Sequence, residues 1–214
     1  MPLRNRVTPF GELIATPARG LMMGNRGGRF HNAGQELAGR PWRGPRWLIC
    51  VTCFKGRQRQ VWGAGYTELF FLDEVTALAA GHRPCAECRR SAARAFRDAL
   101  RPAGGAPPGL TEIDATLHAE RLDGRAKRVH LRPAHSLPCG AMLEHDGEAW
   151  AVRDDRMQHW SPTGYGRSRL AGGGGLRAHT ADHGRRAGCW ICGAVASHRI
   201  LGVGSALASW EQSC

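Results

Sequence analysis

Apolar and polar positions in the first half of the chain alternate as they do in strands, and then change to helical spacing. Asp73 is a favourable N-cap and Gly81 a favourable C-cap, so the Ala-rich stretch between them predicts a short helix over 74–80. Residues 24–31 are rich in Gly and Arg and indicate a loop or short hairpin. The runs with strand-like composition are 47–54, 60–62 and 66–72.

In the second half of the chain, two helical patterns are followed by a strand-like alternation of apolar and polar residues. Residues 87–100 alternate Arg with Ala, which predicts a solvated helix, and 102–109 form a Pro/Gly linker before a second helix over 112–122. Residues 140–161 alternate apolar and polar positions around two acidic turns, which predicts a three-strand antiparallel meander. A run of four glycines, Gly172–Gly175, then breaks the chain.

These elements predict an α+β protein in which a small module precedes a helix and a short antiparallel meander. The expected segments are a basic Gly/Arg-rich N-terminus (1–46), the module (47–101), a helix plus β-meander region (110–170) and a Gly-rich break with a tail (171–214). Beyond residue 178 no strand or helix period is visible. Reading one nucleotide later from His179 restores a helix-like pattern, so we interpret the tail from about 179 onward as frameshifted.

Two cysteine pairs supply the most specific chemistry. Cys50 and Cys53 are separated by two residues, and so are Cys85 and Cys88. Each such pair places two soft thiolates within reach of one ion, and two pairs complete the tetrahedral shell that Zn²⁺ prefers. The sequence therefore predicts one zinc ion held by these four cysteines.

The first pair, Cys50 and Cys53, lies in a strand-like run, where alternation points the two positions to opposite faces unless the chain turns. If Cys53 is not a ligand, His82 or His31 is the expected substitute, because neutral imidazole suits the same ion.

The charge balance indicates a polyanionic partner. Lys plus Arg number 30 against 18 Asp plus Glu, a net charge of +12, and arginine dominates the excess. The guanidinium fork binds two phosphate oxygens at once, so nucleic acid, DNA first, is the expected partner. The candidate contacts are Arg26, Arg29, Arg57, Arg59, Arg83, Arg89, Arg90, Arg125, Lys127 and Arg128.

The segment 70–88 reads Phe-Phe-Leu-Asp-Glu-Val-Thr-Ala-Leu-Ala-Ala-Gly-His-Arg-Pro-Cys-Ala-Glu-Cys, and it resembles the end of the Ada N-terminal metal-binding domain. The resemblance implies one zinc ion, with Cys85 and Cys88 as the second ligand pair and Cys50 and Cys53 as the first. It also implies a reactive thiolate at Cys50. In that family the first ligand cysteine accepts a methyl group from a DNA phosphotriester, and Cys50 holds the corresponding position. The family spaces the two cysteines of its first pair one residue further apart than Cys50 and Cys53. Its insert between the two cysteine pairs is also shorter than the one in this chain. Residues 2–12 read Pro-Leu-Arg-Asn-Arg-Val-Thr-Pro-Phe-Gly-Glu, and with this opening the whole chain also resembles a family of uncharacterised proteobacterial proteins.

The opening residues lack the apolar stretch of a signal peptide, and no run approaches the roughly 18 apolar residues of a membrane span, so we expect a cytoplasmic protein. The expected function is zinc-dependent nucleic-acid binding in DNA damage response or processing. Two alternatives stay open: an enzyme on nucleic acid, either a methylphosphotriester acceptor or a nuclease, and a zinc-stabilised protein-interaction module whose charge is incidental.

Overall fold

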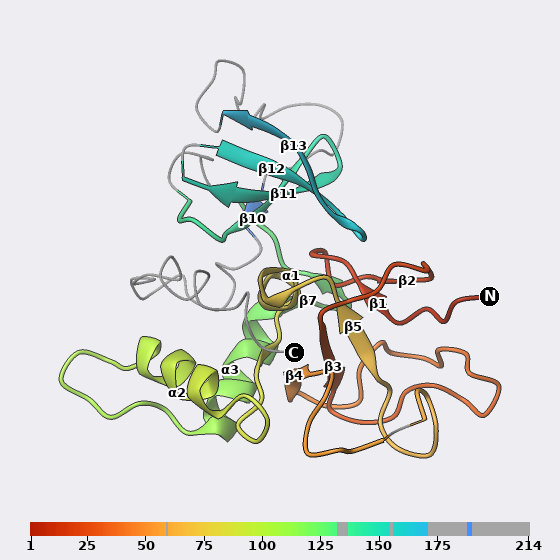
Figure 1. Cartoon of the computed structure of the whole chain (residues 1–214). Helices are drawn as coiled ribbons and strands as arrows, with labels where there is room; N and C mark the ends of the chain where they lie inside the picture. The colour runs from red at the N-terminus through yellow and green to blue at the C-terminus, as the bar shows by residue number, and fades with distance from the viewer. Residues whose placement is uncertain (59, 132–136, 155, 171–187, 190–214) are drawn as a thin grey trace.

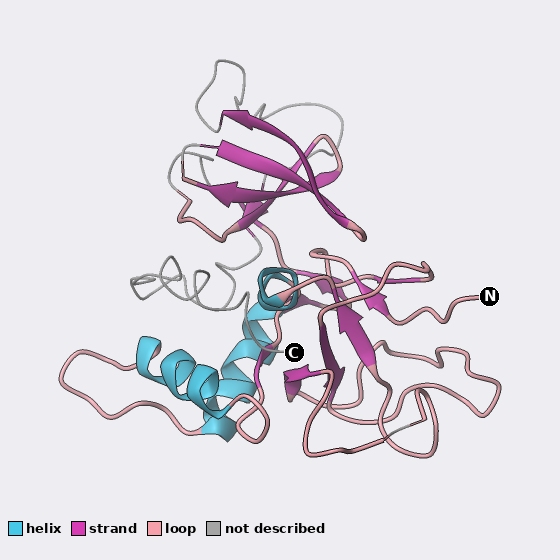
Figure 2. Cartoon of the chain, in the orientation of Figure 1, coloured by secondary structure: helices cyan, strands magenta, loops and turns pink. Residues whose placement is uncertain are grey.

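The computed structural model describes residues 1–58, 60–131, 137–154, 156–170 and 188–189. These residues form helices and several β-sheets, which confirms the mixed α+β class (Figure 2). The predicted strand at 60–62 is absent, because that stretch is a turn in which Trp62 has a φ of 57°. Of the predicted tail from 179 onward, only Gly188–Cys189 belongs to the described residues, and the glycine run at 172–175 lies outside them. No helix of the described residues is long and apolar enough to cross a membrane.

The first sheet has six strands in the order β2-β1-β5-β3-β4-β6. Two of its pairings, β1 with β5 and β4 with β6, are parallel, and the others are antiparallel. Three strands from the first 26 residues thus share one sheet with three later strands, so the sequence boundary at residue 46 falls inside this sheet. The strands are β1 (Arg6–Val7), β2 (Leu13–Ile14), β3 (Met22–Arg26), β4 (Trp47–Val51), β5 (Leu69–Phe71) and β6 (Arg83–Pro84).

Strand β3 lies at the centre of this sheet, although composition favoured a loop over 24–31. Gly24 explains the difference. A Cβ atom at this position would lie 2.0 Å from the carbonyl oxygen of Leu48 and 2.9 Å from the ring of Phe71. The glycine therefore permits close approach of backbone and ring in the sheet, one of the reasons for which glycine occurs inside strands.

Helix α1 (Glu74–Ala79) begins where the cap residues predicted it. The Asp73 carboxylate accepts a hydrogen bond of 2.8 Å from the backbone N–H of Thr76, and Gly81 has a φ of +87° just after the helix. The positive φ stops the helix and turns the chain into β6, which leads directly to Cys85.

The second sheet contains the predicted meander as β10 (Met142–His145), β11 (Glu148–Arg153) and β12 (Arg156–Ser161). A fourth strand, β13 (Gly164–Leu170), extends it, and the backbones of β14 (Gly188–Cys189) and β9 (His130–Leu131) complete the order β13-β12-β11-β10-β14-β9. Trp160 packs in one apolar cluster with Ala79, and its indole N–H donates to the Thr76 hydroxyl at 2.9 Å. Through these contacts the meander packs against α1, which lies between the two sheets (Figure 1).

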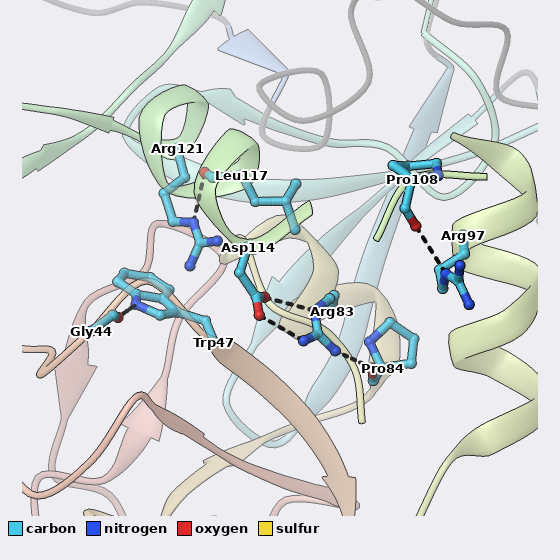
Figure 3. Close-up of polar contacts among 9 residues, drawn as sticks. All are labelled: Gly44, Trp47, Arg83, Pro84, Arg97, Pro108, Asp114, Leu117 and Arg121. Carbon is cyan, nitrogen blue, oxygen red and sulfur yellow. Dashed lines mark hydrogen bonds and ion pairs between the residues drawn. The ribbon is translucent and has the colours of Figure 1, made fainter. Parts of the chain in front are cut away.

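Helices α2 (Arg90–Ala99) and α3 (Leu110–Arg121) flank the first sheet, and a small hairpin of β7 (Leu122–Asp123) and β8 (Ala126–Lys127) follows them (Figure 1). Helix α2 begins at Arg90 and not at residue 87, because the chain first forms a turn through Cys88. Arg83 joins β6 to α3 through a paired contact with Asp114, with N–O distances of 2.7 and 2.8 Å (Figure 3).

Candidate metal centre

Three of the four predicted cysteine ligands converge. The Sγ atoms of Cys50, Cys85 and Cys88 all lie within 4.8 Å of one another. The parallel pairing of β4 with β6 sets Ile49 opposite Pro84, and the N–H of Cys85 donates to the carbonyl of Ile49 at 2.9 Å. Sheet register therefore brings Cys50 next to Cys85, and the turn that follows returns Cys88 to the same point.

The thiol cluster fits a tetrahedral soft-metal site. Zn–S bonds of about 2.3 Å place neighbouring sulfurs about 3.8 Å apart, so small side-chain movements bring the three Sγ atoms to that spacing. Three sulfur donors suit Zn²⁺ and other soft ions better than Mg²⁺ or Ca²⁺, which prefer oxygen. The cluster can therefore hold a metal ion through three protein ligands.

Local hydrogen bonds stabilise negative charge on sulfur. A side-chain hydrogen bond from Cys50 lowers the pKa of Cys85 to about 5, helped by the backbone N–H groups of Cys88 and Glu87 and opposed by burial. The Glu87 N–H lies 3.4 Å from the Cys85 Sγ. The hydrogen bond to Cys85 and burial raise the pKa of Cys50, and burial raises the pKa of Cys88. The protein alone thus favours one thiolate among three sulfurs, whereas a bound cation would favour all three as thiolates.

Cys53 lies outside this cluster. Strand β4 ends at Val51, and Cys53 is exposed beyond it. Positions 50 and 53 point to opposite faces of an extended chain, and no turn in the described chain after Val51 brings Cys53 back to the other three cysteines. A fourth metal ligand from Cys53 would need the chain beyond β4 to turn back towards Cys50.

The two histidines considered as substitutes belong to other contacts. His31 has Nδ1 2.7 Å from the Thr67 hydroxyl and Nε2 3.1 Å from the carbonyl of Gly63. His82 packs against Trp47, with ring centroids 5.0 Å apart, and its Nε2 accepts from Arg26. Neither imidazole joins the thiol cluster among the residues that the structure describes.

A cavity of about 220 Å³ adjoins the three thiols. Cys50, Cys85 and Cys88 form part of its lining, together with Tyr66 and Arg57. The guanidinium of Arg57 pairs with Glu87 at 2.6 Å, and both side chains are exposed. A group bound at the metal would therefore face a partly apolar cavity with one ion pair at its edge.

The basic residues predicted to contact nucleic acid differ in how far they are buried. Arg83 and Arg89 are interior and pair with Asp114 and Glu74, so their charges act within the fold and are not available to a surface ligand. Arg26 is also buried. Arg59 lies outside the described residues, and Lys127 is half-buried. The exposed candidates are Arg29, Arg57, Arg90, Arg125 and Arg128.

Arg94 was not among the sequence candidates, although its spacing from Arg90 could have identified it. Positions i and i+4 share one helix face, and both guanidiniums are exposed on α2. The two arginines border a shallow depression that also includes Cys88. A basic edge of α2 therefore lies directly beside the thiol cluster.

Comparison with known proteins gives no family or fold relative, because no family model, no curated protein and no solved structure matches the chain.

Proposed function

We propose that this chain is a zinc-dependent nucleic-acid-binding protein of Ada-like organisation. Cys50, Cys85 and Cys88 hold the ion, and Cys53 is the best remaining candidate for the fourth ligand. The convergence of three thiols from two distant segments is the observation that carries the proposal. The sequence resemblance of residues 70–88 supports the same arrangement.

The basic edge of α2 supports nucleic acid as the partner. Arg90 and Arg94 present two guanidiniums from one rigid helix next to Cys88. A metal ion at the cluster would fix this helix, since α2 begins two residues after Cys88. The net charge of +12 adds long-range attraction for a polyanion. The metal would thus act mainly as a structural support for a phosphate-binding surface.

Salt dependence tests the nucleic-acid proposal. Binding to duplex DNA should weaken steeply with salt, because each neutralised phosphate releases counterions. The double variant Arg90→Gln and Arg94→Gln should weaken binding and reduce the slope of log K against log salt by about 2. Fluorescence anisotropy at several salt concentrations measures both quantities. The matched control, Arg153→Gln with Arg156→Gln, removes the same charge from exposed positions on the second sheet. Equal losses in the two double variants, or no binding by the wild type, would contradict the proposal.

A second candidate function, methyl transfer to Cys50, is favoured by the position of this residue in the cavity wall. The Cys50 sulfur would form a bond to the methyl carbon of a methylphosphotriester. The carbon–oxygen bond would break, and its electron pair would stay on the phosphate oxygen, giving a phosphodiester anion. A metal ion held by Cys50, Cys85 and Cys88 would keep the Cys50 sulfur deprotonated.

Peptide mass mapping tests methyl transfer directly. After incubation of the zinc-loaded protein with methylphosphotriester DNA, we expect one added methyl group on the peptide that contains Cys50. Cys139 serves as an internal control, because it is a half-buried cysteine outside the cluster. Methylation of Cys139 to the same extent as Cys50, or of neither, would exclude Cys50 as a specific acceptor.

A further inference from the structure

A second cavity, of about 390 Å³, lies between the loop after β1, strand β4 and the end of α3. Its lining includes the two buried arginines Arg26 and Arg121 and the indole rings of Trp42 and Trp47. It shares no residue with the cavity beside the thiol cluster. Its volume is in the range of pockets that bind small molecules.

Arg26 is only 1 % exposed, yet its hydrogen bonds go to neutral groups. Its Nε lies 3.2 Å from Nε2 of His82, and its two terminal nitrogens donate to the carbonyl oxygens of Gly11 (2.9 Å) and Pro41 (3.4 Å). Burial, together with the charge of Arg26, lowers the pKa of His82 well below its usual value, so this histidine is a neutral acceptor. A guanidinium has five N–H donors, so two of those on Arg26 are left for a ligand.

Arg121 is 3 % exposed and has still fewer partners. Its Nε donates to the Leu117 carbonyl at 2.8 Å, while neither terminal nitrogen has a hydrogen-bond partner within the described part of the chain. The nearby carboxylate of Asp114 already gives both oxygens to Arg83, as Figure 3 shows. A buried guanidinium with unused donors is costly, and an anion would offset that cost.

Both guanidiniums rest on one aromatic side chain. The Cζ atoms of Arg26 and Arg121 lie 4.1 and 4.5 Å from the ring centroid of Trp47. Burial lowers the pKa of each arginine to about 9, and the charge of Arg121 contributes to the shift of Arg26. Each therefore stays mostly protonated at neutral pH, and both side chains line the same cavity.

The rest of the lining fits an anion that carries a planar group. Lys127 and Arg125 add positive charge at the cavity, and Glu12 is the single acidic residue in its described lining. Trp42 is half-buried, with its ring 6.0 Å from that of Trp47, so it offers an aromatic wall next to the cations. Guanidinium pairs bind phosphate oxygens in bidentate fashion, and indole rings stack on nucleobases.

We propose that this cavity binds a phosphomonoester bearing a planar ring, such as a nucleoside monophosphate, with the phosphate between Arg26 and Arg121 and the ring against Trp42. The site goes beyond the proposed function, because it needs neither the metal ion nor the basic edge of α2. It also gives the two buried arginines a ligand that the fold itself does not supply.

Isothermal titration calorimetry with adenosine 5′-monophosphate tests the proposal, with inorganic phosphate and adenosine as separate probes. We expect the monophosphate to bind more tightly than phosphate, and adenosine to show no measurable binding. Arg121→Gln should weaken the monophosphate at least tenfold, and Arg153→Gln, an exposed charge on the second sheet, should leave it unchanged. Trp42→Leu should remove the advantage of the monophosphate over phosphate.

Thermal unfolding of each variant shows whether it is folded, and Lys127→Ala provides a second charge variant at a half-buried position if Arg121→Gln does not fold. Lys127→Ala should also weaken the monophosphate. Equal affinity of phosphate and monophosphate for the wild type would overturn the planar-ring part of the proposal. Absence of binding, or unchanged binding in the folded arginine and lysine variants, would overturn the site itself.

Discussion

Replacing Cys85 by serine should abolish stoichiometric zinc binding and lower the free energy of unfolding by about 3–5 kcal/mol. Cys85 is the buried member of the cluster, and it directly follows strand β6, which is paired with the strand that carries Cys50. A metal ion there would link β4, β6 and the start of α2, so its loss would release three elements together. For a chain of this size the expected fall in the unfolding temperature is about 6–20 °C. Metal analysis of the purified protein and thermal unfolding measure the two effects.

Two cysteine variants sharpen this experiment. Cys139→Ser removes a half-buried thiol outside the cluster and should keep the zinc content and unfolding temperature of the wild type. Cys53→Ser identifies the fourth ligand, because X-ray absorption separates Zn–S distances of about 2.3 Å from Zn–N or Zn–O distances of about 2.0–2.2 Å. Four sulfurs in the wild type and three in Cys53→Ser would establish Cys53 as the fourth ligand. Full zinc content in Cys85→Ser would contradict the site.

Local sequence signals identified cysteines that could bind a metal ion, but not the geometry that brings three of them together. The spacing of Cys85 and Cys88 after a Pro, and the caps Asp73 and Gly81, act within a few residues and can be read from the chain. The neighbour of Cys85 depends on the register of β4 against β6, which is a long-range pairing. Alternation placed Cys50 and Cys53 on opposite faces of an extended chain without deciding which of them joins Cys85 and Cys88, and the structure leaves Cys53 outside the cluster.

Burial of arginine was the other feature that composition could not predict. Arg83, Arg89 and Arg90 look alike in the sequence, yet two are interior and one is exposed. What separates them is a carboxylate partner at a distance, Asp114 for Arg83 and Glu74 for Arg89. Similarly, Gly24 favoured a loop by its type, and only its close contact with Leu48 explains a strand. Such long-range contacts are invisible to any reading of local pattern.

The ion pair between Arg83 and Asp114 holds α3 to the strand that precedes Cys85. It is bidentate, and the two side chains are only 4 % and 9 % exposed. Asp114 also supports the charge of Arg121, which lies on the same helix. Removing this one carboxylate would therefore leave two buried guanidiniums without an acidic neighbour among these contacts.

Asp114→Ala should accordingly destabilise the protein by about 3–5 kcal/mol, because it leaves Arg83 buried and unpaired. Replacing both partners, as Arg83→Met with Asp114→Leu, should recover most of that loss, since the double variant buries apolar groups and no lone charge. Asp98→Ala is the matched control. Its partner Arg101 lies 2.9 Å away in an ion pair about half exposed, and such pairs contribute less than about 1 kcal/mol. Denaturant unfolding measures all three variants. Similar losses for Asp114→Ala and Asp98→Ala would mean that the interior pair does not hold α3 to the sheet.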